Sequence, residues 1–143
     1  MQITSISFYH FTQRSSQWWA FKQMRLAYRE LAKTSGLLFH KQLGSGAAQG
    51  FSIWPDWQVY AQLMVWESRA AFDKYIESHT YSLDTLVQSD EHLHILLEPT
   101  QLKGTWNGSQ PFVKNEHSSE PCDYMAVITR ASIRPRKIVS FWS

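Results

Sequence analysis

The sequence has little cysteine, no long apolar run and no large excess of charge. One cysteine, Cys122, occurs among 143 residues, so neither an intrachain disulfide nor a zinc site built from cysteines is expected. No apolar run approaches the ~18 residues that cross a bilayer, and Met1 is not followed by a segment of the signal-peptide kind. We therefore expect a cytoplasmic protein without a transmembrane segment.

The net charge of +2 conceals an uneven distribution along the chain. Residues 1–45 hold six Lys/Arg and one acid, residues 56–98 hold two Lys/Arg and eight acids, and residues 99–143 hold six Lys/Arg and three acids. A nucleic-acid surface would be basic throughout. Here the basic end segments can instead face the acidic middle segment, within one chain or across a dimer. We expect no nucleic-acid partner.

The hydrophobic pattern alternates between the strand period and the helix period. The expected order is β-α-β-β-α-β, which predicts an α+β fold with a ferredoxin-like βαββαβ unit in residues 1–112. An antiparallel sheet of this kind leaves one face without helices, and two such faces can close into a barrel. We therefore expect a homodimer with dimeric α/β-barrel architecture. The expected strands are 4–11, 37–43, 58–66 and 92–97, and the expected helices are 15–34, a helix after Ser68, and a further helical stretch around 83–87.

The first helix has recognisable ends and an apolar stripe. Ser15 or Ser16 is expected to cap its start, as Ser68 caps the next helix, and Gly36 marks its end. The residues that recur at steps of three and four, and that are expected to face the core, are Phe21, Met24, Tyr28 and Leu31.

The chain beyond residue 112 divides into a polar linker, 113–123, and a final segment, 124–143. The final segment begins with YMAVITRASIRP, which predicts an extra strand, and continues as a tail. Its layout is similar to the start of the chain, so it is either the beginning of a second repeat or a fifth strand of a single unit.

Six histidines provide candidate ligands. His92 and His94 are two residues apart on a predicted strand, so both rings point to the same side. That pair either chelates a metal or lies on a solvated strand face. His79 ends the apolar stripe of the second helix, where it is either a ligand or a histidine at the edge of the core.

Aromatic residues make up 15% of the chain, and rings that carry a polar atom suit a core around a pocket. The glycine-rich loop at 44–50 leads into a strand rather than a helix, which argues against a dinucleotide fingerprint. Its aromatic end can instead form the lip of a pocket. The expected substrate-pocket residues are Phe51, Trp54, Tyr60 and Trp66.

Arg130 and Arg134 lie on one face of the last predicted strand. Their guanidinium groups can bind carboxylates of a ligand, such as haem propionates, through bidentate hydrogen bonds. They can equally pair with the acidic middle segment of the chain, and the sequence leaves both interpretations open.

Seven segments follow one another in the order of one known family. They are SISFYHF at 5–11, WAFKQM at 19–24, LLFHKQLGSGAAQGF at 37–51, VYAQLMVW at 59–66, EHLHILLEP at 91–99, GTWNGSQPF at 104–112 and AVITRASIRPRKIVSFW at 126–142. Together they resemble the spheroidene monooxygenase family of carotenoid-modifying oxygenases, over the N-terminal half and the start of the second half of its longer members. The resemblance implies a dimeric α/β-barrel fold, oxidoreductase activity and a haem cofactor.

The same resemblance ranks the histidines. Because His92 lies within a family-like segment, it becomes the expected axial ligand of haem iron, ahead of His79. The first hypothesis is thus a haem-dependent monooxygenase-like oxidoreductase acting on an apolar, carotenoid-like substrate. The alternative is a non-catalytic or cofactor-free dimeric α/β-barrel protein that binds a small ligand. The sequence identifies neither the electron donor nor the particular substrate.

Overall fold

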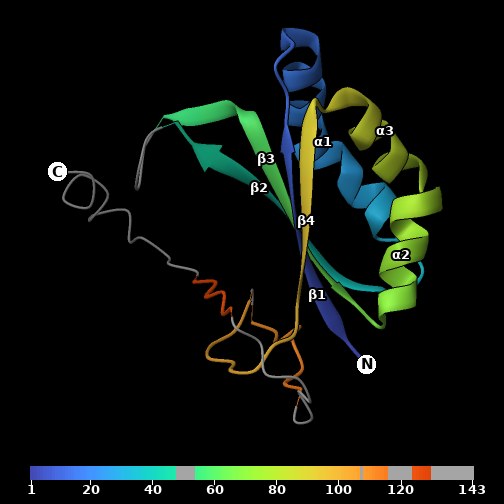
Figure 1. The fold of residues 1–143 in the computed structure, drawn as a ribbon, viewed down its shortest axis with the longest axis vertical. Helices are drawn as coiled ribbons and strands as arrows, with labels where there is room; N and C mark the ends of the chain where they lie inside the picture. Colours follow the sequence, from blue (N-terminus) through green and yellow to red (C-terminus); the bar gives the residue numbers. More distant parts are fainter. Residues whose placement is uncertain (48–53, 107, 116–123, 130–143) are drawn as a thin grey trace, which may run out of the picture.

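The computed structural model describes residues 1–47, 54–106, 108–115 and 124–129, and they form one sheet with helices on one side (Figure 1). The strands are antiparallel and follow the order β2-β3-β1-β4 across the sheet. This arrangement confirms the predicted α+β, ferredoxin-like fold. The elements are β1 (Ile3–His10), α1 (Arg14–Leu31), β2 (Leu37–Gly46), β3 (Pro55–Trp66), α2 (Arg69–Ser78), α3 (Thr80–Gln88) and β4 (Glu91–Leu97).

The predicted N-terminal cap is confirmed for α2 but not for α1. Ser68 caps α2 as predicted, since its hydroxyl accepts a hydrogen bond from the backbone N–H of Ala71 at 3.2 Å. The prediction for α1 is wrong, because this helix is capped by Gln13 without a side-chain hydrogen bond. Ser16 is buried instead, and its hydroxyl donates to the side-chain oxygen of Gln88 at 2.9 Å.

The predicted buried face of α1 is also partly wrong. Leu31 is buried, but Phe21 and Tyr28 are 42% and 37% exposed. The residues that face the sheet include Ala20 and Ala27. The sheet supplies large rings on this side, so small side chains on α1 let the helix approach closely.

Two clusters of buried side chains fill the space between the sheet and the helices. One cluster surrounds Trp66, Phe72 and Tyr75 at one end of the sheet, and the other surrounds Tyr9, Phe11 and Tyr60. Because side chains alternate along a strand, the inward residues of β1 are odd-numbered and those of β3 are even-numbered.

The opposite face of the sheet carries no helix (Figure 1). Most of its side chains are apolar, as the strand register shows. Leu93 and Ile95 of β4 are 56% and 37% exposed there. Toward β2, Phe39 packs against the rings of Trp106 and Phe112, with ring centroids 5.9 and 6.3 Å apart, so residues after β4 lie over part of this side.

Only part of the predicted C-terminal segment, 124–143, lies within the described residues. Residues 124–129 are exposed and have no regular secondary structure, where the start of an extra strand was predicted. The remainder of that segment, including Arg130 and Arg134, lies outside the described residues. Across the described ranges, no helix is both long enough and apolar enough to cross a membrane.

Candidate functional site

A row of polar side chains crosses the sheet beneath the helices. Gln42 of β2 pairs with Gln62 of β3, Gln62 pairs with Ser7 of β1, and Ser7 pairs with His94 of β4. We call Gln42, Gln62, Ser7 and His94 the polar row. Gln62 and Ser7 are each 3% exposed, so this part of the interior is polar at a depth where apolar residues are usual.

The hydroxyl of Tyr81 joins the two glutamines of the polar row. It accepts one hydrogen bond from Nε2 of Gln62 at 3.1 Å and a second from Nε2 of Gln42 at 3.3 Å. Burial raises the pKa of Tyr81 to about 12, although hydrogen bonds to Thr85 and to the two glutamines oppose the shift. The tyrosine therefore stays protonated near neutral pH and keeps a proton to donate.

Several buried polar atoms around the polar row have no hydrogen-bond partner among the described residues. They are Oε1 of Gln62, the hydroxyl of Tyr75 and the hydroxyl of Ser82. An unpaired polar group in the interior costs about 1–3 kcal/mol, so such groups are usually satisfied by water or by a ligand. The interior beside the polar row therefore holds polar atoms whose hydrogen-bonding capacity the described residues do not use.

His94 ends the polar row at the edge strand. Its Nδ1 lies 2.8 Å from the hydroxyl oxygen of Ser7, and its ring meets the rings of Tyr9 and Phe72 at centroid distances of 5.8 and 6.0 Å. Burial, with a smaller contribution from the charge of His92, lowers the pKa of His94. The imidazole is accordingly neutral near pH 7.

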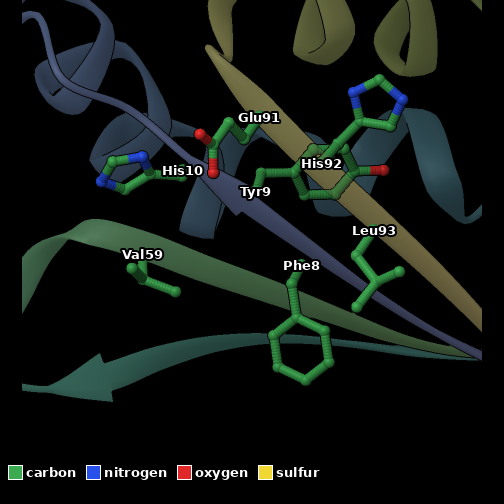
Figure 2. A pocket seen from close by; sticks show the side chains of 7 residues that line it. All are labelled: Phe8, Tyr9, His10, Val59, Glu91, His92 and Leu93. Atoms are coloured by element: carbon green, nitrogen blue, oxygen red, sulfur yellow. The ribbon is translucent and has the colours of Figure 1, made fainter.

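His92 lies beside His94, with ring centroids 5.3 Å apart, as the two-residue spacing predicts. The ring of His92 is exposed and makes no hydrogen bond within the described residues. In Figure 2 it points to the side of the sheet that carries the helices, whereas Phe8 and Leu93 point to the opposite side. His92 is thus an accessible imidazole on a hydrogen-bonded strand.

A shallow hollow of about 160 Å³ lies at this edge of the sheet (Figure 2). Its lining side chains come from β1, β3 and β4, and those of Phe8, Val59 and Leu93 are apolar. Ligand pockets commonly have volumes of about 300–1,000 Å³. One chain therefore offers part of a pocket here.

Three of the four predicted substrate-pocket residues are described, and these three do not come together. Trp66 and Tyr60 are core residues in different clusters of the interior, and Trp54 is 72% exposed. Phe51 lies outside the described residues. Because Trp66 and Tyr60 pack against the helices, burial in the core explains their size and position.

The other predicted ligands contribute less to the described site. Nε2 of His79 lies 3.0 Å from the hydroxyl oxygen of Thr34, and its ring packs against Tyr75 at 5.0 Å. His79 is therefore a histidine between α2 and α3 whose Nε2 already has a partner. Within the described ranges, no group of three His, Cys, Asp or Glu side chains is arranged to hold a metal ion.

The polar row was not predicted from the sequence. A signal does exist, because Gln62 stands between Tyr60 and Met64 on the inward side of the strand, as the one hydrogen-bonding amide in the run 59–66. Its partners cannot be found in this way. Ser7 and His94 come from distant strands, and only the register brings them beside Gln62.

Solved structures share this fold, although no protein-family model matches the chain. A mutant form of SnoaB, a cofactor-independent oxygenase from Streptomyces nogalater, is 14% identical, with a TM-score of 0.50 over 71% of this chain and 95% of SnoaB. A dimeric ferredoxin-like protein of unknown function from Jannaschia sp. is 15% identical, with a TM-score of 0.52 over 68% of this chain and 99% of that protein. The chain is thus a ferredoxin-like α+β protein.

Sequence relatives define the family more narrowly. The chain is 31% identical over 144 residues to the spheroidene monooxygenase of Rhodobacter capsulatus and 34% identical over 149 residues to that of Cereibacter sphaeroides. These alignments span the whole chain but 60% and 44% of the two relatives. The chain resembles the spheroidene monooxygenase family along its whole length, as its sequence segments indicated, and it spans about half the length of the curated relatives it matches.

Proposed function

We propose that the chain provides a substrate-binding unit of a monooxygenase that acts on an apolar, carotenoid-like substrate. The observation that carries the proposal is the whole-chain similarity to spheroidene monooxygenases. The structure supports it with the hollow at one edge of the sheet, where the apolar side chains of Phe8, Val59 and Leu93 lie together. The accessible ring of His92 lies at the same edge, on the side of the sheet that carries the helices (Figure 2). Phe8, Val59 and Leu93 would contact the apolar body of the substrate, and burial of that surface would drive binding.

We propose that His92 is the residue that would hold the iron of haem. Such a ligand is best held on a rigid element with a neutral imidazole nitrogen free to bind. His92 lies on β4, which pairs with β1 along its length, and its ring is exposed without a hydrogen bond inside the described ranges. When bound, haem would supply the redox chemistry that an oxygenase requires.

His94 would position and tune its neighbour. The contact with Ser7 and the packing of Phe72 hold the ring of His94 beside that of His92. Because burial lowers its pKa, His94 adds no positive charge next to the accessible imidazole near neutral pH.

An optical spectrum of the purified protein, with and without added haemin, tests the haem proposal. We expect a Soret band with about one haem per chain. We expect His92→Ala to lose haem and His94→Ala to keep most of it with a shifted band. His79→Ala is the matched control, and it should retain the wild-type spectrum. Haem that never binds, or a spectrum that depends on His79 and not on His92, overturns the assignment.

A second candidate function is a cofactor-independent oxygenase or small-ligand binder. The polar row favours it, since Tyr81 and Gln62 provide buried donors and acceptors without a metal. SnoaB, an oxygenase that is itself described as cofactor-independent, shares the fold. If haem does not bind, and Gln62→Leu abolishes ligand binding or oxygen uptake while His92→Ala does not, this second function replaces the first.

We also propose a homodimer. The helix-free face exposes Leu93 and Ile95, and exposed apolar sheet faces are usually covered by another sheet. A fold neighbour, the Jannaschia protein, is described as dimeric. A second copy would also enclose the hollow that one chain leaves shallow.

A further inference from the structure

The outward face of α1 carries aromatic and basic side chains together. Residues 14, 18, 21, 25 and 29 follow one another at steps of three and four, so they share one face of the helix. That face holds Arg14, Trp18, Phe21, Arg25 and Arg29, all of them exposed. The buried residues Ala20, Ala27 and Leu31 lie on the side toward the sheet.

The aromatic residues of this face pack against one another in the open. Trp18 stacks on Phe21 with ring centroids 5.5 Å apart, and Trp57 of β3 meets Phe21 edge-on at 5.3 Å. Trp18, Phe21 and Trp57 are 60%, 42% and 49% exposed. We call Arg14, Trp18, Phe21, Arg25, Arg29 and Trp57 the basic aromatic surface.

The charges of the basic aromatic surface are not neutralised by neighbours in the described part of the chain. The ion pair present there joins Arg69 and Asp73 on α2, and no carboxylate pairs with Arg14, Arg25 or Arg29 within those residues. The sole acid in α1 is Glu30, which lies off this face of the helix. Positive charge and exposed tryptophan are thus concentrated together on one outward helix face.

We propose that the basic aromatic surface docks the protein onto an anionic lipid bilayer. Tryptophan rings favour the interface between lipid headgroups and acyl chains, and basic side chains are attracted to anionic headgroups. A helix lying in the plane of the membrane combines these same two components. Because α1 lies on the helix side of the sheet (Figure 1), its exposed face stays open when two helix-free faces meet in a dimer.

Docking on a bilayer would bring the protein to the phase that holds an apolar substrate. The inference itself rests on the composition and exposure of α1, and it requires neither haem nor turnover. Its failure and the failure of the proposed oxygenase function are therefore separable. A vesicle assay of the intact protein reports on the surface, and the haem spectrum reports on the site.

Co-sedimentation with vesicles tests the proposal. We expect the protein to bind vesicles of phosphatidylcholine mixed with phosphatidylglycerol, and to bind pure phosphatidylcholine vesicles much less. Raised salt should weaken the binding, because charges at a membrane surface are screened. Arg25→Gln should lower the partition coefficient about fivefold, the contribution typical of one basic residue. The double variant Trp18→Ala/Trp57→Ala should lower it by about fivefold or more, since two interfacial rings are removed.

Matched controls make the experiment specific. Lys74→Gln on α2 and Leu83→Ala on α3 remove an exposed cation and an exposed apolar side chain elsewhere, and both should bind like the wild type. Equal binding to the two kinds of vesicle overturns the proposal, as does equal loss in Arg25→Gln and Lys74→Gln. Tight binding to heparin or single-stranded DNA without binding to vesicles also overturns it, and identifies a surface for soluble polyanions.

Discussion

The indole N–H of Trp66 donates a hydrogen bond to the hydroxyl oxygen of Ser5 across 2.9 Å. Both residues are fully buried, and the bond joins the two central strands, β1 and β3, on the side of the helices. Trp66 also packs against Phe72 and Tyr75, with ring centroids 5.9 and 4.9 Å away. The residue expected to line a pocket is therefore a structural link between sheet and helix.

The first prediction concerns this bond. Trp66→Phe should lower the free energy of unfolding by about 3 kcal/mol, because a large ring shrinks and Ser5 loses its buried partner. Urea denaturation measures the loss. In a double-mutant cycle, Ser5→Ala should cost less in the Trp66→Phe background than in the wild type. Equal costs in the two backgrounds contradict an energetic contribution from the bond.

The second prediction compares two buried tyrosines. Tyr81→Phe leaves the amide donors of Gln42 and Gln62 without their acceptor, so it should lower the free energy of unfolding by about 1–3 kcal/mol. Tyr75→Phe removes a buried hydroxyl that has no partner among the described residues, and it should be neutral or stabilising. Denaturation of both variants under one condition checks the difference, and a larger cost for Tyr75→Phe refutes it.

The sequence predicted the order of the elements well because each signal was local. The pairs of Gln42 with Gln62 and of Ser7 with His94 depend on strand register, which local patterns do not encode over long separations. The face of α1 was mispredicted for a related reason. The periodic rule assigns large apolar residues to the core, but the sheet already fills that space with Trp66 and Tyr9.

The candidate site was predicted less completely than the fold. The pairing of His92 and His94 on one side followed from their spacing, and the structure agrees. Their difference in exposure did not follow, because His94 is covered by Phe72 of α2, and the position of that helix is a tertiary property. The sequence therefore identified both imidazoles without separating the covered ring from the accessible one.

The third prediction concerns pH. Burial lowers the pKa of His94, so the unfolded state binds more protons than the native state as pH falls below about 6.5, the usual histidine value. The contribution of neutral His94 to stability is present above that pH and is lost as pH falls toward its lower native pKa. Stability should thus decrease on acidification, and His94→Gln should decrease less. Urea midpoints between neutral and acidic pH check this, and parallel curves for both proteins refute it.

The fourth prediction concerns the effect of His92 on the pKa of His94. Burial is the larger cause of the lowered pKa of His94, and the positive charge of His92 is the smaller one. His92→Gln removes the charge, so the pKa of His94 should rise toward its usual value while staying below it. An NMR titration of the His94 ring measures the change. A pKa of His94 that does not move in His92→Gln contradicts the coupling of the two rings.

The last prediction concerns assembly through the helix-free face. Ile95 and Leu93 alternate with inward residues along β4 and are partly exposed. In a two-fold dimer each substitution acts twice, so Leu93→Glu should raise the dissociation constant by at least about tenfold, which equals about 1.4 kcal/mol. Val87→Glu is the matched control, because Val87 is 83% exposed on α3, on the side of the helices. Light scattering at micromolar concentration should find a wild-type dimer, a dimeric Val87→Glu variant and a monomeric Leu93→Glu variant. A monomeric wild type, or dissociation of both variants alike, removes the helix-free face as the dimer interface.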